Sequence, residues 1–410
     1  MKLEELKKYK RILILGYGKE GKATEQFLKK YVPDAEIGIA DKNLNDNYLN
    51  EQINYDLVIK TPGIPKKYIT KPYTTATNIF FANISNIVIG VTGTKGKSTT
   101  VSLIYNILKN AGRQVFLLGN IGKPMLEELL NPLSKESIFV LELSSYQLDD
   151  CNYSPHISVV LDLFPEHMNY HGDVANYYQA KKNIVTYVKN EDYFIYNPRF
   201  EELKKWANEI KCFSLPFEET IIDLKNSNLI GEHNLENVRA AITVSHLLEV
   251  DSKVIIKSIE TFQPLPHRLQ KVGTFKKITF YDDAISTTPE STIFAIETLK
   301  NIGTIFLGGE DRGFDFHKLV SIVGKFGIAN IVIFPDSGDK VLDLIKNRKN
   351  YPNILKTKNM EEAVKFAYKF TPEGKICLLS CASPSYSLWK NFEEKGDLFQ
   401  RYVKKYGLSK

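Results

Sequence analysis

The sequence predicts an α/β protein of three domains, each built around a parallel sheet. Short β-branched apolar runs alternate with longer amphipathic stretches along the chain, as in strands joined by crossover helices. Glycine-containing turns follow two of these runs where a helix should begin. At 410 residues the chain exceeds one ordinary domain, and 43% hydrophobic with 25% charged residues is typical of a globular protein.

The first strand–turn–helix unit carries a nucleotide-type glycine pattern. Gly16, Gly18 and Gly21 form G-x-G-x-x-G directly after the apolar run that begins at Arg11. Asp41 ends the next expected strand, where the dinucleotide fingerprint places an acid for ribose hydroxyls. Taken alone, the pattern predicts only that a phosphate or nucleotide lies over this helix N-terminus.

The remaining elements follow the same alternation. The division into domains is expected at residues 1–85, 86–264 and 265–410, with a linker at the two prolines of "FQPLPHRLQ". The runs expected to contain strands lie within residues 11–24, 36–41, 55–65, 86–112, 137–145, 157–163, 277–284, 303–309, 330–338 and 375–383.

Composition excludes several classes of protein. The net charge of +6 is modest and the lysines are dispersed, so we expect no nucleic-acid partner. The chain has no signal-peptide core and no apolar run of membrane-spanning length, so we expect a cytoplasmic protein without a membrane partner. The four cysteines lack zinc-like spacing and are expected to be reduced thiols: Cys151, Cys212, Cys377 and Cys381.

The segment "VTGTKGKSTT" (91–100) has the parts of a phosphate-binding loop but misses the standard pattern by one residue. Gly93 and Gly96 would let backbone N–H groups converge on anionic oxygens, Lys97 would neutralise them, and Ser98 would hold Mg²⁺. A tight turn with a helix cap would explain the glycines and the serine, but not the lysine between them.

"GVTGTKGKST" resembles the nucleotide loop of the Mur ligase family, whose members use G-T-x-G-K-S/T. Further segments follow in that family's order and span nearly the full chain: "LELSSYQLD", "LFPEHMNYHG", "YYQAKKNI", "GEHNLEN", "LPHRLQ", "LGGEDRGFDF" and "CASPSYSLWKNFEEKG". The resemblance implies a Rossmann-like first domain, a central ATPase-like domain and a Rossmann-like third domain. "ELSSYQL" and "KNFEEKG" are most similar to members that act on glutamate.

The resemblance implies an ATP-dependent ligase that adds glutamate to UDP-N-acetylmuramoyl-L-alanine through an acyl phosphate, in peptidoglycan precursor synthesis. The implied cofactors are ATP and two Mg²⁺ ions, the partners are these small molecules alone, and a monomer is expected. Closure of the third domain would protect the acyl phosphate from water.

The resemblance also implies roles for individual residues. Catalytic positions are Lys97, Glu142, His167 and Lys181, and magnesium ligands are Ser98, Glu142, His167 and Lys181 as a carbamate. ATP-binding positions are Gly93, Thr94, Lys95, Gly96, Lys97, Ser98, Thr99, Asn234, Asn237, Arg268 and Asp283. Substrate-binding positions are Gly18, Lys19, Glu20, Asp41, Thr61, Pro62, Gly63, Asn120, Thr287, Arg312, Ser385 and Phe392. Glu166 would support the site, His171 would be structural, and Lys182 would point away from it on the helix surface.

One departure leaves the amino acid open. Glutamate-adding relatives commonly have D-S-K-A-T-N where this chain reads "DDAISTTPEST", so Ile285 stands at the lysine position while Thr287 keeps the hydroxyl. Either isomer of glutamate is therefore compatible with the sequence.

Three other functions remain as alternatives. A folylpolyglutamate synthase would share the loop and the lysine carbamate, but would not need the glycine fingerprint for a UDP group. A nucleotide-binding module without catalysis would not need Glu142, His167 and Lys181 together. An oxidoreductase that binds a dinucleotide would leave "GTKGKST" unexplained.

Overall fold

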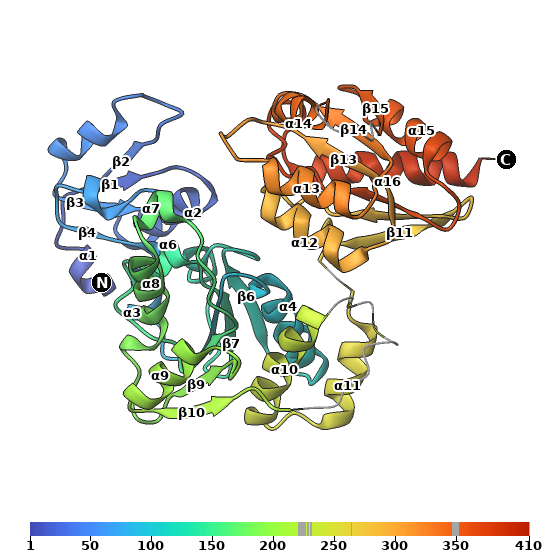
Figure 1. Cartoon of the computed structure of the whole chain (residues 1–410). Coiled ribbons are helices and arrows are strands. Elements are labelled where there is room, and N and C mark those ends of the chain that lie inside the picture. The colour runs from blue at the N-terminus through green and yellow to red at the C-terminus, as the bar shows by residue number, and fades with distance from the viewer. Residues whose placement is uncertain (220–226, 228, 230–231, 264, 347–351, 410) are drawn as a thin grey trace. The chain divides into compact units, whose positions relative to one another are not determined.

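The computed structural model covers the whole chain and describes residues 1–219, 227, 229, 232–263, 265–346 and 352–409. The chain divides into two compact units, Met1–Phe262 and Gln263–Lys410. The first unit contains two sheets and the second contains one (Figure 1).

The first sheet has four parallel strands in the order β2-β1-β3-β4. Its strands are β1 (Arg11–Leu15), β2 (Glu36–Ala40), β3 (Leu57–Lys60) and β4 (Tyr73–Thr74), with helices α1 (Leu3–Leu6), α2 (Lys19–Tyr31), η1 (Tyr48–Asn54), η2 (Lys66–Tyr68) and α3 (Ala76–Ala82). Strand β1 is central, with later strands on one side and β2 on the other. The glycine loop after β1 therefore lies at the switch point where such sheets bind ligands.

The second sheet has six parallel strands in the order β10-β9-β8-β5-β7-β6. They are β5 (Ile87–Thr92), β6 (Val115–Gly119), β7 (Ile138–Glu142), β8 (Ile157–Val160), β9 (Tyr193–Tyr196) and β10 (Phe213–Pro216). The helices are α4 (Lys97–Asn110), α5 (Met125–Glu128), α6 (Ser145–Leu148), α7 (Met168–His171), α8 (Val174–Thr186), α9 (Glu201–Glu209), α10 (Glu232–Leu247) and α11 (Ser252–Thr261). Strand β5 lies between β7 and β8, so the lysine-containing loop opens at the middle of the sheet's carboxyl edge.

Both sheets of the first unit share one hydrophobic core. Phe80 of α3 lies edge to face with Phe139 of β7, with 5.4 Å between the ring centroids. A second core packs α4, α10 and α11 on the other face of the second sheet, through side chains such as Ile104 and Val238. Because both faces of β5 and β7 are covered, these strands are continuous apolar runs in the sequence.

The second unit contains a six-stranded sheet in the order β11-β12-β16-β13-β14-β15. Its strands are β11 (Gln270–Phe275), β12 (Ile278–Asp282), β13 (Ile302–Gly308), β14 (Asn330–Phe334), β15 (Asn353–Lys356) and β16 (Ile376–Leu379). Its helices are α12 (Pro289–Leu299), α13 (His317–Lys325), α14 (Ser337–Lys346), α15 (Met360–Phe370) and α16 (Phe392–Leu408), and apolar cores fill both faces.

The third sheet is parallel except at one edge. Strand β11 pairs with β12 in the antiparallel direction, across a two-residue turn at Lys276 and Lys277. Both residues have positive φ, of 49° and 61°. Hairpin turns of this kind usually carry asparagine or glycine, so two lysines gave no signal of a hairpin.

The predicted α/β class is confirmed, and each sequence run expected to contain a strand does contain or overlap one. The division into three domains stays a prediction, because the first two sheets lie in one compact unit. Within the described parts of the chain, no helix is long and apolar enough to cross a membrane.

Candidate active site

The loop between β5 and α4 has the backbone shape of an anion-binding turn. Gly93 and Gly96 have positive φ, of 155° and 78°, and Gly96 caps the N-terminus of α4. A Cβ atom on Gly96 would lie 2.2 Å from Oδ1 of Asn237, so only glycine allows α10 to pack here. Thr100 also donates to this oxygen, at 3.2 Å. Asn237 in turn donates to Asn234, so both predicted asparagines lie beside the loop on α10.

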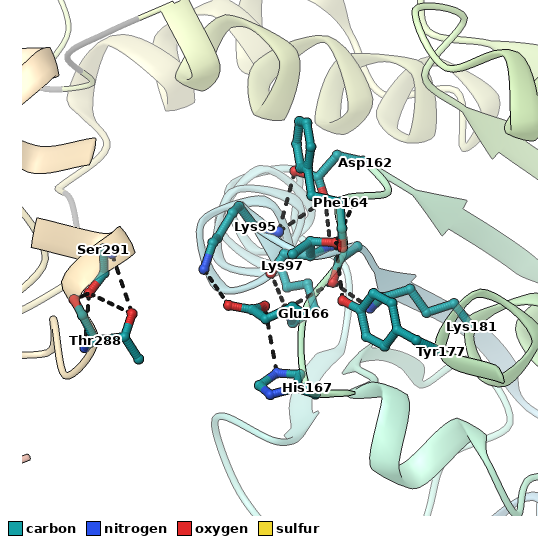
Figure 2. A network of polar contacts seen from close by, with 12 residues as sticks. Lys95, Lys97, Asp162, Phe164, Glu166, His167, Tyr177, Lys181, Thr288 and Ser291 are labelled. Atoms are coloured by element: carbon teal, nitrogen blue, oxygen red, sulfur yellow. Dashed lines mark hydrogen bonds and ion pairs between the residues drawn. The ribbon is translucent and has the colours of Figure 1, made fainter. Parts of the chain in front are cut away.

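Two lysines converge on the carbonyl oxygen of Gly93. Nζ of Lys97 donates to it at 2.9 Å and to Thr94 O at 2.9 Å, and Nζ of Lys181 donates to it at 2.7 Å (Figure 2). Lys181 is 1% exposed, and its Nζ lies 4.8 Å from the centre of the Tyr177 ring. Burial, and then the charge of Lys97, lower the pKa of Lys181 well below its ordinary 10.5. This shift favours the neutral amine, which is the form that can react with CO₂.

Glu142 offers one unused carboxylate oxygen inside the protein. It ends β7 and is 1% exposed, and its Oε1 accepts a hydrogen bond from Nδ2 of Asn120 at 2.7 Å. Its Oε2 is buried without a hydrogen-bond partner. A buried carboxylate oxygen is costly unless a cation faces it. Glu142 and the buried Ser98 at the start of α4 are thus oxygen donors of the kind Mg²⁺ prefers.

His167 lies in the segment that joins β8 to α7. It has a left-handed backbone with φ of 60°, and its side chain is 40% exposed. Its Nε2 lies 3.6 Å from Glu166, whose other oxygen pairs with Lys95 at 2.7 Å. Burial lowers the pKa of His167 below 6.5, and Glu166 only partly offsets this shift. A neutral imidazole at pH 7 can donate its nitrogen lone pair to a metal.

Asp162 is a site residue that the sequence reasoning missed. It follows β8 and accepts hydrogen bonds from the backbone N–H groups of Thr94 and Lys95, the second at 3.0 Å. Burial raises the pKa of Asp162, while these N–H groups and Lys97 oppose the shift. Thr94 itself bonds to the hydroxyl of Tyr177 at 3.1 Å. The only signal in the sequence was an acid directly after the apolar run of β8.

The described residues contain no group of three or more histidine, cysteine, aspartate or glutamate side chains that could hold a metal ion. Glu142, Ser98 and His167 surround the loop as separate donors instead. Such a set fits Mg²⁺ that also takes oxygen ligands from phosphates and water, rather than an ion held by the protein alone.

The predicted UDP-binding residues lie around the glycine loop of the first sheet. Gly18 caps α2, and a Cβ on Gly16 would lie 1.9 Å from the hydroxyl of Thr61. Asp41 accepts the N–H of Tyr17 at 2.7 Å, so its carboxylate braces this loop. Glu20, in the first turn of α2, has a buried Oε1 without a hydrogen-bond partner. Lys19 and Gly63 are exposed.

A tyrosine connects this loop region to the segment that carries His167. The hydroxyl of Tyr170 donates to the carbonyl of Pro62 at 3.2 Å. His171, predicted to be structural, is buried and lies 3.1 Å from the hydroxyl of Ser145. The first unit therefore brings the predicted UDP-binding residues and the residues around the lysine-containing loop into one connected region.

The second unit places Arg268 and Asp283 close together at the end of β12. Asp283 is 3% exposed and accepts from Ser380 at 2.7 Å and from the N–H of Leu269 at 3.1 Å. Burial raises the pKa of Asp283 to about 6, although these bonds and Arg268 oppose the shift. Nε of Arg268 is buried without a hydrogen-bond partner.

The predicted amino-acid-binding residues belong to the same unit, three of them in loops and Phe392 at the start of a helix. Ser385 has a buried hydroxyl without a partner, and Arg312 pairs with Glu310 at 3.0 Å. Thr287 is half-buried in the loop before α12. Phe392 begins α16, and its aromatic ring packs on the hydrophobic core.

Known proteins resemble this chain over nearly its full length. Residues 91–228 match the family model described as the Mur ligase middle domain. A UDP-N-acetylmuramoylalanine–D-glutamate ligase of Ligilactobacillus salivarius is 32% identical, over 99% of this chain and 98% of that protein. A ligase of the same name from Clostridioides difficile is 30% identical, over 97% of this chain and 98% of that protein.

Solved structures share the fold at lower identity. The MurF ligase of Thermotoga maritima in complex with ADP has a TM-score of 0.61 at 18% identity, over 96% of this chain and 95% of that one. The UDP-N-acetylmuramate-alanine ligase MurC of the same organism has a TM-score of 0.60 at 16% identity, over 98% and 100%. With near-complete coverage by relatives at 30% identity or more, this chain belongs to the Mur ligase family.

Proposed function

We propose that this protein joins D-glutamate to UDP-N-acetylmuramoyl-L-alanine, with cleavage of ATP to ADP and phosphate, in peptidoglycan precursor synthesis. The observation that carries the proposal is the group around Gly93, where Lys97 and Lys181 meet at a helix N-terminus. Glu142, which acts electrostatically on Lys97, has a buried oxygen without a hydrogen-bond partner. The similarity to ligases named for this reaction, over nearly the whole chain, supports the choice of substrates.

In the first step, the carboxylate of the UDP-linked substrate attacks the γ-phosphorus of ATP and becomes an acyl phosphate. A free carboxylate is a poor electrophile, so this activation is needed before an amide can form. Lys97 and the N–H groups at the start of α4 offset the negative charge that develops on the transferred phosphoryl group. Arg268 is assigned to the same charge, and its unpaired Nε supports that assignment.

In the second step, the amine of glutamate attacks the acyl carbonyl. A tetrahedral intermediate forms, phosphate leaves, and the amide remains. We assign the carboxylates of the amino acid to Arg312 and to the unpaired hydroxyl of Ser385, with Thr287 and Phe392 beside them.

Magnesium would be held by Ser98, Glu142, His167 and a carbamate on Lys181, and it would supply positive charge to the phosphate oxygens. The residues present fit that assignment. Glu142 has an unused buried oxygen, and Lys181 is a buried amine with a lowered pKa. Carbamylation would turn Lys181 from a donor into an anionic oxygen ligand.

The ATP base and ribose are assigned to Asn234, Asn237 and Asp283. The UDP group is assigned to Gly18, Lys19, Glu20 and Asp41, with Thr61, Pro62 and Gly63 along the path of the substrate. Asn120, which donates a hydrogen bond to Glu142, is assigned to the same path. We further propose a monomer that works in the cytoplasm.

The direct test is release of phosphate from ATP and Mg²⁺ with UDP-N-acetylmuramoyl-L-alanine and either D- or L-glutamate. We expect release to require the UDP-linked substrate and D-glutamate together. Lys97→Met should reduce the rate on the order of 10²–10³-fold, because a loop cation is lost. Release with L-glutamate alone would keep the mechanism and overturn the amino acid, and Ile285 is the observation that makes this second candidate worth testing. Release without any UDP-linked substrate would overturn the proposal.

A further inference from the structure

Glu20 puts a carboxyl group where the UDP-linked substrate should carry its negative charge. It is the second residue of α2, directly after the glycine loop at the switch point of the first sheet. The N-terminus of such a helix attracts a diphosphate through its free N–H groups and the helix dipole. An ionised glutamate in the same place would repel that diphosphate.

The surroundings of Glu20 stabilise its ionised form only in part. Its Oε1 is buried and has no hydrogen-bond partner. The cation that faces it is Lys60 of β3, but Nζ of Lys60 already pairs with Asp150 at 2.5 Å and donates to Ile64 O at 3.0 Å. From α6 the facing group is the uncharged amide of Gln147.

Gln147 fixes which part of its amide can reach Glu20. Its Oε1 accepts from the N–H and the hydroxyl of Ser144, both at 3.0 Å, so its amide NH₂ is left for the carboxyl group. One oxygen of Glu20 can therefore be satisfied by Gln147. The other, Oε1, is left for a ligand or for a proton.

We propose that Glu20 is a neutral carboxylic acid in the complex with the UDP-linked substrate, that it donates a hydrogen bond to a diphosphate oxygen, and that binding therefore takes up one proton. The inference rests on the proposed function, because it needs a UDP-linked substrate at this loop. The proton that is taken up comes from solvent. It binds to Oε1 of Glu20 and lies between that oxygen and the diphosphate. Glu20 thus positions the substrate by donating a hydrogen bond, as a serine hydroxyl would, but it can do so only while its carboxyl group is protonated.

The direction of the pH dependence follows from the free protein. Burial raises the pKa of Glu20 to about 7, while Gln147 and Lys60 oppose the shift. The diphosphate's charge would raise it further in the complex. Binding should therefore be tightest and independent of pH below about 7, and should weaken as pH rises above it.

Calorimetric binding of UDP-N-acetylmuramoyl-L-alanine to the full chain, without ATP, tests the proposal. This ligand has no group that changes charge between pH 6 and pH 8.5, so any linked proton belongs to the protein. The Kd of the natural protein should rise by up to about tenfold per pH unit above pH 7. At pH 7.5, heats in buffers of different ionisation enthalpy should give uptake of roughly three-quarters of a proton.

The Kd of Glu20→Gln should not change with pH, and this variant should take up no proton from the buffer when it binds the ligand. Its affinity at pH 8.5 should match the affinity of the natural protein at pH 6.5. The matched control is Glu25→Gln on the same helix, where the carboxylate pairs with Lys29 and accepts from Tyr17. This variant should keep the pH dependence of the natural protein.

A pH-independent Kd in the natural protein would overturn the inference, and so would weaker binding by Glu20→Gln at every pH, since the carboxylate would then act as an acceptor. Those outcomes leave the proposed function intact. Failure of the natural protein to bind the ligand at any pH, while it still binds ADP, would count against the proposed function instead.

Discussion

Two adjacent lysines show how the fold decides what a residue can do. Lys181 and Lys182 are consecutive on α8, about 100° apart around the helix axis. Lys181 is buried over Tyr177 beside Lys97, whereas Nζ of Lys182 pairs with Glu209 at the surface, at 2.5 Å. The sequence singled out Lys181 only through its resemblance to a family motif. Its burial and its lowered pKa come from the packing of α8 on β5, which no local pattern encodes.

Replacing these lysines tests the carbamate. Lys181→Ala should reduce kcat on the order of 10²–10³-fold, because an anionic oxygen near the phosphates is lost. Formate or acetate at high concentration should restore part of the rate, because a carboxylate oxygen can then occupy the space left by the lysine side chain. Lys182→Ala should keep the rate within about twofold, because an exposed pair contributes little. Full activity of Lys181→Ala, or a loss without any rescue, would contradict the assignment.

Asp162 makes a second prediction for a single residue. Its carboxylate accepts hydrogen bonds from the N–H groups of Thr94 and Lys95, so it shapes the loop. Asp162→Ala removes the side-chain acceptor of the Lys95 N–H, while the Thr94 N–H keeps its second acceptor, the backbone carbonyl of residue 162 at 3.3 Å. An unpaired donor costs about 1–3 kcal/mol, so the KM for ATP should rise roughly tenfold or more. Asp162→Asn keeps an oxygen acceptor and should fall between the alanine variant and the natural protein. Steady-state kinetics over ATP concentration decide this, and equal KM values for all three proteins would show that the contact is dispensable.

Among the residues assigned to the site, the sequence could place those at or just after the carboxyl ends of strands. Glu142 after an apolar run and the lysine-containing loop after β5 lie where parallel topology requires. It could not predict side-chain partners. Asp41 accepts a hydrogen bond from the N–H of Tyr17, and Asn120 donates one to Glu142. Both contacts join segments from different parts of the chain.

At the scale of elements, the missed strands have physical reasons. Strand β4 has two residues, and β10 and β15 are half-exposed edge strands, so none presents a buried apolar run. The β11–β12 hairpin turns on two lysines with positive φ. Strands β6 and β9 do contain apolar runs, "VFLLG" and "YFIY", so their signal was present in the sequence.

A buried ion pair fixes the end of β3 to the segment after α6. Lys60 and Asp150 are 0% and 2% exposed, with 2.5 Å between Nζ and Oδ2, and Asp150 also accepts from Tyr73 at 2.9 Å. Removing one partner leaves the other charge buried and alone. The pair therefore connects the end of a strand of the first sheet to a segment of the second.

A double-mutant cycle measures this connection. Lys60→Met and Asp150→Asn should each lower the free energy of unfolding of the first unit by about 3–5 kcal/mol, and the double variant should lose less than the sum. Urea unfolding of all four proteins gives the coupling. The control is the surface pair Lys66–Asp149, at 3.0 Å, whose coupling should not exceed about 1 kcal/mol. Additive losses at Lys60 and Asp150 would mean that the pair does not act as a unit.

At the scale of the whole molecule, two compact units carry separate hydrophobic cores and one tryptophan each. Trp206 lies on α9 of the first unit and is 2% exposed, while Trp389 of the second is 8% exposed and lies edge to face with Phe334. Two prolines in the linker segment marked this boundary in the sequence. Each tryptophan becomes exposed when its own unit unfolds, so variants with one tryptophan report on one unit.

Unfolding followed in Trp389→Phe and Trp206→Phe should therefore give two transitions that respond differently to ligand. The residues assigned to the UDP group belong to the first unit alone, and a ligand stabilises only the part of a protein that binds it. UDP-N-acetylmuramoyl-L-alanine at 100 times its Kd should add about 2.7 kcal/mol to the transition seen by Trp206 and leave that of Trp389 in place. If both reporters shifted together, the two units would unfold as one cooperative body, and the separate cores would not be independent sources of stability.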